Sequence, residues 1–370
     1  MSRSVSNAGT RLAGFGHRWL PFADAASADL SLPRLLRLSL FQLSTGMAVV
    51  LLTGTLNRVM VVELGQAAVW VALMLAIPLL LAPARALIGY RSDHHRSYLG
   101  WRRIPYLWSG TMMQFGGLAF MPFALILMTE AHSGPEWMGP VAAMGAFLLT
   151  GLGMHVAQTA GLALATDLAT EETRPRVVAL LYFMLLVGMI GSALIFAAFL
   201  ENFSYFRLIQ VIQSAAVVTL VLNVAAMLKQ EMRRPDLTDH RLARPTFGHA
   251  WQDFIALPRA RRLLWALGLG TMGFTMQDIL LEPYGAQVLG LSVSDTTLLT
   301  AMFAGGMILA LLLTSRRLGN GADPIRTASM GILIGIVAFA AVILSAPFLA
   351  PALFQLGAAL IGLGNGLFAV

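Results

Sequence analysis

Charged and titratable side chains gather in one short segment of the sequence, ALIGYRSDHHRSYLGWRRIPYLWSG at residues 86–110. Gly89 permits a tight turn, and Asp93 can accept hydrogen bonds from the N-terminal amides of a following helix. The arginines can cap helix carbonyls or form ion pairs with Asp93. We interpret the segment as a charged clasp between helices, made by Gly89, Arg91, Asp93, Arg102 and Arg103. The alternative is a positively charged anchor with no further role.

Two acids, Asp278 and Glu282, stand four residues apart in an apolar segment, so they share one face of a helix. An ionised side chain costs about 2.5–3.5 kcal/mol at the centre of a membrane-inserted helix, so these acids need partners or water. We expect Arg58 to be that partner, within about 4 Å. Arg58, Asp278 and Glu282 would then form an outer charge cluster. A proton or ion relay is the alternative use of such acids.

Motifs for catalysis are not recognisable in this sequence. We find no phosphate-binding loop, no nucleophile triad and no paired-metal constellation. The chain has no cysteine, which excludes disulfides and thiolate chemistry. We therefore expect a protein that is not an enzyme and that has no metal site of its own.

The elements that position these residues are membrane helices. Hydrophobic residues make up 57% of the 370 residues and charged residues only 12%, and the mean hydropathy is +0.74. Apolar segments of about 20 residues, long enough to cross a membrane, recur from Leu35 onwards. Ten helices are expected, at 34–62, 67–89, 103–128, 138–168, 174–200, 205–229, 260–290, 295–314, 325–346 and 350–370. Residues 1–32 resemble a cytoplasmic tail rather than a cleaved signal peptide.

The distribution of basic residues predicts the orientation. With a cytoplasmic N-terminus, the cytoplasmic segments and their flanks hold 23 of the 25 arginines and lysines, all except Arg58 and Arg207. The net charge of +7 would suggest a nucleic-acid partner in a soluble protein. Here the topology explains the charge, and we expect no nucleic-acid partner.

The sequence also contains a repeat at an offset of 225 residues. This offset relates Pro33-Arg34 to Pro258-Arg259, Leu64-Gly65 to Leu289-Gly290, and Arg91 to Arg316. A long polar segment separates the copies, so the repeat is parallel, as in the major facilitator architecture. We predict an all-α polytopic membrane protein with two parallel-repeat six-helix bundles. Its parts are a tail at 1–32, a first bundle at 33–229, a cytoplasmic linker at 230–258, and a second bundle at 259–370. The second bundle is expected to be incomplete in this chain, with about four of its six helices.

Four segments, at 38–65, 85–106, 158–182 and 276–290, together resemble one branch of the major facilitator superfamily. These are the PucC/LhaA-type proteins of purple phototrophs, which deliver bacteriochlorophyll. The resemblance implies an assembly factor, or chaperone, for light-harvesting complexes in the intracytoplasmic photosynthetic inner membrane. Bacteriochlorophyll, carotenoid and lipids are its implied ligands. Its implied partners are antenna alpha and beta polypeptides and the reaction centre core complex. An LhaA-like role for the core antenna is preferred over a PucC-like role for the peripheral antenna.

Together with this resemblance, His155 becomes a candidate pigment ligand, because it is the one histidine of seven in the middle of an expected helix. A neutral imidazole there can ligate the magnesium of bacteriochlorophyll or hydrogen-bond to a neighbouring helix. Gln158 lies on the same helical face. A stripe of small residues could receive a flat macrocycle or pack another helix; its members are Gly153, Ala157, Gly161 and Ala165. The alternative function is a proton-coupled secondary transporter of a small solute.

Overall fold

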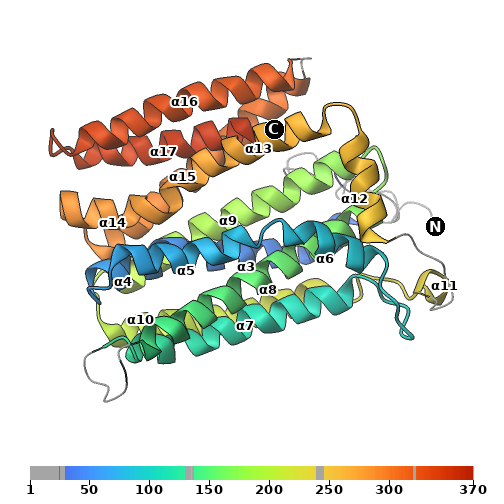
Figure 1. Cartoon of the computed structure of the whole chain (residues 1–370), viewed down its shortest axis with the longest axis horizontal. Coiled ribbons are helices and arrows are strands. Elements are labelled where there is room, and N and C mark those ends of the chain that lie inside the picture. Colours follow the sequence, from blue (N-terminus) through green and yellow to red (C-terminus); the bar gives the residue numbers. More distant parts are fainter. Residues whose placement is uncertain are drawn as a thin grey trace, which may run out of the picture.

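The computed structural model describes residues 25, 30–129, 135, 137–238, 246–319 and 322–369. Within those ranges, nine helices are long and apolar enough to cross a membrane. They run side by side and alternate in direction (Figure 1). The chain is therefore a multi-pass membrane protein of the all-α class, as the sequence predicts.

The first half of the chain contains six spans. The first is built from four consecutive pieces, and the second is interrupted near Pro83. The pieces of the first span are α2 (Leu32–Leu38), α3 (Leu40–Val49), the π-helix η2 (Val50–Leu56) and α4 (Asn57–Val62). The others are α5 (Ala68–Leu80) with α6 (Ala84–Asp93), α7 (Ile104–Ile126), α8 (Met138–Leu168), α9 (Arg174–Leu200) and α10 (Tyr205–Met227).

The second half begins after a linker that carries two short helices, α11 (Pro235–Thr238) and α12 (Phe247–Ala256). Its first segment is broken at Met276 into α13 (Ala260–Thr275) and α14 (Gln277–Leu289). We count these two helices together as the seventh span, although neither is among the nine long apolar helices. Three spans follow: α15 (Val293–Gly319), α16 (Pro324–Ser345) and α17 (Pro351–Phe368). The single helix expected over 260–290 is thus two helices, and the break places Gln277 and Asp278 at the start of the second.

The two halves meet through specific helix pairs. α9 packs on α15, while α14 packs on η2 and α4, so the first and seventh spans face each other. The repeat is visible in the backbone as well. Gly65 follows α4 with φ of 61°, and Gly290, 225 positions later, follows α14 with φ of 67°. Gly290 is the first residue after α14, whereas Gly65 lies three residues after the end of α4, and both adopt the left-handed region that glycine adopts most readily.

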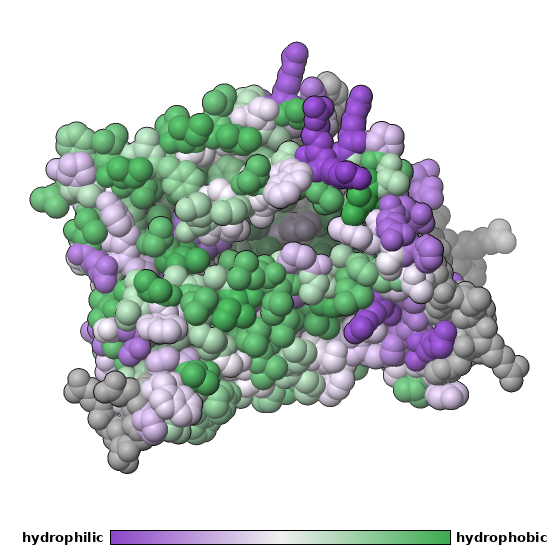
Figure 2. Space-filling view, viewed as in Figure 1, coloured by the Kyte–Doolittle hydropathy of each residue, from purple (hydrophilic) through white to green (hydrophobic). Residues whose placement is uncertain are grey.

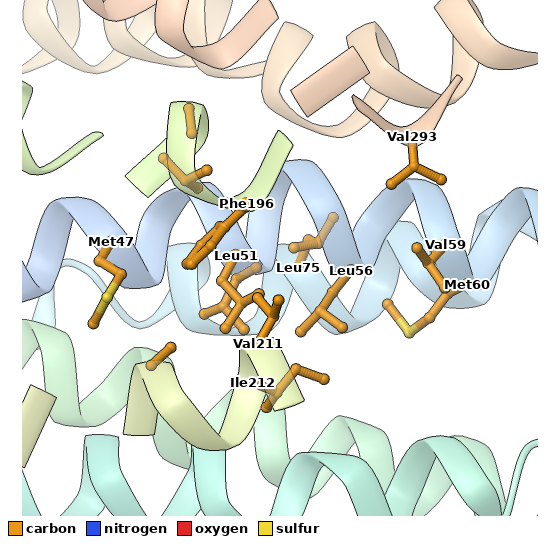
Figure 3. Packing of buried hydrophobic residues seen from close by; sticks show 14 of the residues in the cluster. Met47, Leu51, Leu56, Val59, Met60, Leu75, Phe196, Val211, Ile212 and Val293 are labelled. Atoms are coloured by element: carbon orange, nitrogen blue, oxygen red, sulfur yellow. The ribbon is translucent and has the colours of Figure 1, made fainter. Parts of the chain in front are cut away.

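The apolar core is arranged around the first span. In Figure 3, Met47, Leu51 and Leu56 lie along this span, with Phe196 of α9 on one side and Ile212 of α10 on the other. All five side chains are at most 7% exposed. Val293 of α15 extends the same cluster into the second half. The first span therefore lies at the centre of the first half and also packs on α14 and α15 of the second half.

The surface is apolar along the middle of the bundle and most hydrophilic at the end where α6 and α12 lie (Figure 2). We call this end the basic end, because it carries Arg91, Arg103 and Arg261. α12 runs across the direction of the spans there (Figure 1). Exposed large apolar residues such as Trp108 of α7 and Leu194 of α9 cover the sides of the bundle, as expected where a helix contacts lipid.

Candidate functional site

Arg103 is the centre of the charged network at the basic end. Its guanidinium forms an ion pair with Asp93 and donates through Nε to Asp167 at 3.0 Å. It also donates to the hydroxyl of Ser92 at 2.6 Å. The arginine is only 4% exposed, so these contacts satisfy a buried cation. One side chain therefore ties together the end of α6, the start of α7 and the end of α8.

The start of α7 is capped by Glu231, which follows α10. Its carboxylate accepts hydrogen bonds from the backbone amides of Arg102 at 2.7 Å, Arg103 at 3.0 Å and Ile104 at 2.9 Å. The N-terminal amides of a helix attract a negative charge, which explains this placement. The cap formed by Glu231 was not predicted from the sequence. The available signal was a single acid standing between Lys229 and Arg233.

The remaining clasp residues are placed differently from one another. Arg102 reaches Asp167 at 3.5 Å, with both side chains partly exposed, and Arg91 is exposed on the last turn of α6. The expectation that Gly89 forms a tight turn is wrong. α6 continues through it to Asp93, and a Cβ added at Gly89 would make an ordinary contact with the side chain of Thr159 on α8. The helix ends instead at His94, whose backbone amide donates to the carbonyl of Tyr90 at 3.2 Å.

The expected pairing of Arg58 with Asp278 or Glu282 is also wrong. Arg58 forms its ion pair with Glu63, and it donates to the carbonyl of Leu291 at 3.3 Å. Glu63 lies one residue after α4, within easy reach of Arg58. The contact between the first and seventh spans comes from Asn57, which donates to the carbonyl of Ile279 at 2.8 Å.

The two acids of the seventh span line a cavity between the halves. Its volume is about 200 Å³, and its walls come from the first, fifth, seventh, eighth and tenth spans. Its polar lining residues are Thr53, Gln277, Asp278, Glu282, Thr300 and Asn365. Glu282 accepts a hydrogen bond from Thr300 at 2.6 Å, and Asp278 accepts one from Gln277. The acids therefore belong to the interior of the molecule and not to an outer charge cluster with Arg58.

His155 occupies the contact between α8 and α5. Its Nε2 lies 3.0 Å from the carbonyl of Pro78, near the end of α5. A carbonyl only accepts, so Nε2 carries the proton in this contact and only Nδ1 could ligate a magnesium ion. The structure thus contains the helix-to-helix hydrogen bond that was the alternative for His155. Pigment ligation by His155 stays a prediction.

Gln158 forms its hydrogen bond with a different helix from the one that His155 contacts. Its side-chain amide donates to Gln42 of α3 at 3.2 Å. His155 and Gln158 share a face of α8 but bond to two different helices. The structure therefore does not bring them together around one ligand position.

The stripe of small residues on α8 is filled by protein. A side chain at Gly153 would collide with the backbone of Gln114 on α7, and one at Gly161 would meet the ring of Phe41 at 2.5 Å. Ala157 is buried against Gly110 of α7. The suggestion that a flat macrocycle lies on this stripe is wrong, because close helix packing uses it.

Comparison with known sequences identifies relatives over most of the chain. Residues 55–370 match the family described as PUCC protein. Protein PucC of Rhodovulum sulfidophilum is 53% identical over 374 residues, covering 100% of this chain and 82% of that protein. An uncharacterized protein in the puhA-bchM intergenic region of Rhodobacter capsulatus is 55% identical, covering 95% and 74%. The bacteriochlorophyll synthase 44.5 kDa chain of Rhodobacter capsulatus is 28% identical, covering 91% and 77%.

Solved structures with the same architecture are transporters. The nucleoside transporter NupG superposes with a TM-score of 0.62 at 14% identity, covering 90% of this chain and 80% of that one. The xylose transporter XylE from E. coli, partially occluded and inward open, gives 0.61 at 13% identity, covering 90% and 85%. At such low identity these matches establish the fold alone, which is that of the major facilitator superfamily.

Proposed function

The chain belongs to the PucC protein family, and on this premise we propose that it is a non-enzymatic assembly factor for light-harvesting complexes. It receives bacteriochlorophyll, and carotenoid as a second pigment, and passes them to antenna polypeptides within the membrane. The observation that carries the proposal is the match to this family over residues 55–370. The relative at 28% identity is named as a chain of bacteriochlorophyll synthase, and this name supports the choice of pigment.

The size of the central cavity favours delivery along the lipid-facing surface. Pockets for drug-sized ligands measure about 300–1,000 Å³. The cavity between the halves measures about 200 Å³, and a bacteriochlorophyll with its long apolar tail exceeds a drug-sized ligand. On a lipid-facing helix surface the macrocycle stays in hydrocarbon, and only its magnesium needs a ligand.

An apolar groove lies on the second half of the molecule. It measures about 440 Å³ and lies between the seventh and ninth spans, lined by Leu280, Tyr284 and Phe339 among others. In the first half, α10 packs on both α3 and α7, which correspond to α13 and α16 at the offset of 225 residues. The groove is thus equivalent to a position that a helix covers in the first half, and we do not assign it to pigment.

The partners follow from the same premise. We propose that antenna alpha and beta polypeptides, and the reaction centre core complex, pack directly on the transmembrane surface, in the photosynthetic membrane of a purple bacterium. The basic end would be cytoplasmic, together with the N-terminus. We propose the core antenna as the first client to be tested, and the peripheral antenna is the alternative.

The test is the absorption spectrum of the gently purified protein from phototrophically grown cells. Co-purifying bacteriochlorophyll, together with loss of one antenna complex when the gene is deleted, is the expected result. A colourless protein whose deletion leaves both the core and the peripheral antenna intact would refute the proposal. The identity of the lost antenna decides between the two clients.

A further inference from the structure

Glu282 is a buried carboxyl group with incomplete hydrogen bonding. The residue is 3% exposed, and it lines the cavity between the halves. One carboxyl oxygen accepts a hydrogen bond from Thr300 at 2.6 Å. The other oxygen, Oε2, is buried and has no hydrogen-bond partner among the residues that the structure describes. Burying a carboxylate in this way is costly unless a cation or a proton neutralises it.

No basic side chain is among the described residues that line the cavity, and the Arg58 charge that acts on Glu282 is already paired with Glu63. Asp278 is the second titratable group of the cavity and would add a like charge. Among the helices packed on α14, α4 contributes Arg58, which is paired with Glu63. α15 contributes Asp295, which lies near the N-terminus of that helix and accepts a hydrogen bond from the hydroxyl of Ser292. The two arginines of α13, Arg261 and Arg262, lie in its first turn at the opposite end and are exposed.

We propose that Glu282 is an exchangeable proton-binding site in the central cavity, with Asp278 as the second acceptor that the proton can reach through cavity water. The ligand class is a proton, because a proton neutralises the carboxylate without needing the several oxygen ligands that a metal cation requires. The cavity is large enough for water, since one molecule occupies about 30 Å³. This inference does not depend on the pigment function.

Proton occupancy of Glu282 is coupled to the contact between the halves. Its carboxyl group packs directly against Gly54 of η2, so closely that a Cβ at position 54 would overlap it. A π-helical segment such as η2 is uncommon and is often found at functional sites. Ionised Glu282 would draw water between η2 and α14. The protonated form therefore favours the contact between η2 and α14 that the structure shows, and release of the proton weakens this contact.

Infrared spectroscopy of the full chain in lipid nanodiscs tests the proposal, because a neutral carboxylic acid has its own carbonyl band. At neutral pH, wild-type protein should show such a band, and Glu282→Gln should lose it while retaining the fold. Glu201→Gln, at an exposed position after α9, is the matched control and should leave the band unchanged. Asp278→Asn should shift the band, because the second acceptor is lost.

Labelling with dicyclohexylcarbodiimide, which modifies protonated carboxyl groups in apolar surroundings, gives a second readout by peptide mass. Modification at Glu282 that disappears at alkaline pH is expected. If Glu282→Gln fails to fold, this mapping on the wild type still decides the question. Ionised Glu282 at neutral pH in both measurements would overturn the proposal. So would a band that sodium ions abolish at constant pH, because the site would then hold a metal cation.

Discussion

Arg103 pairs with Asp93 across the break between α6 and α7, and the pair is held from a third helix by Asp167. The arginine is nearly buried, whereas the side chains of Asp93 and Asp167 are 46% and 37% exposed. A cation that is surrounded by protein and reaches two half-exposed carboxylates fixes three helix ends relative to one another. The ends of the second, third and fourth spans are therefore linked to one another at the basic end.

Replacing Arg103 by alanine should lower the free energy of unfolding by about 1–3 kcal/mol, because Ser92 and both carboxylates lose a buried donor. The loss stays below the 3–5 kcal/mol of a fully buried pair, since water screens the exposed carboxylates. Thermal or denaturant unfolding in detergent measures the change. Arg102→Ala is the control and should cost less than about 1 kcal/mol, because its pair is longer and exposed. Equal effects of both variants would contradict the central role of Arg103.

Replacing Glu231 by alanine should destabilise the start of α7 by about 1–2 kcal/mol, because three backbone amides lose their acceptor. Hydrogen exchange of the peptide that contains residues 102–106 should become faster, while exchange in the middle of α7 stays unchanged. Glu171→Ala, at an exposed position before α9, removes the same charge without a cap and serves as the control. Unchanged exchange at 102–106 would show that the cap is dispensable.

The helix pattern was predictable from the sequence, because apolar length and turn residues determine it locally. The spans at 138–168 and 174–200 begin and end as expected. The parallel repeat also followed from the sequence, since Gly65 and Gly290, which are 225 positions apart, adopt the same left-handed backbone conformation just after α4 and α14.

The partners of the charged residues were less predictable, because they depend on side chains from distant parts of the chain. Arg58 was assigned to the acids of the seventh span because membrane acids need a partner. Glu63, five residues away, provides a local one. Glu231 reaches the start of α7 from a loop 127 residues later in the sequence. A contact between residues so far apart cannot be predicted from the periodicity of the sequence. The break at Met276 was not predicted either, because no glycine or proline stands at that position.

Replacing Gly54 by alanine should weaken the packing of η2 on α14, because the added methyl group would occupy the position of the Glu282 carboxyl group. Overpacking of this kind costs about 1–3 kcal/mol. Gly191→Ala is the matched control, since a Cβ there meets nothing within 4 Å and alanine favours a helix by up to about 1 kcal/mol. Unfolding measurements on both variants should differ in sign. A Gly54→Ala protein as stable as the Gly191→Ala protein would show that Glu282 is free to move away.

Replacing His155 by leucine should reduce the bacteriochlorophyll bound to the purified protein several-fold, because leucine offers the magnesium no ligand. The bundle should remain folded, since the variant loses one hydrogen bond to Pro78, worth about 1 kcal/mol. The ratio of pigment absorption to protein measures the effect, and near-identical unfolding curves exclude a general loss of structure. His94→Leu removes a histidine at the basic end and should keep its pigment. Full pigment and normal antenna assembly in His155→Leu would make His155 a packing residue. The magnesium ligand would then be a carbonyl group or water on another helix face, because the stripe beside His155 is already filled by α7 and Phe41.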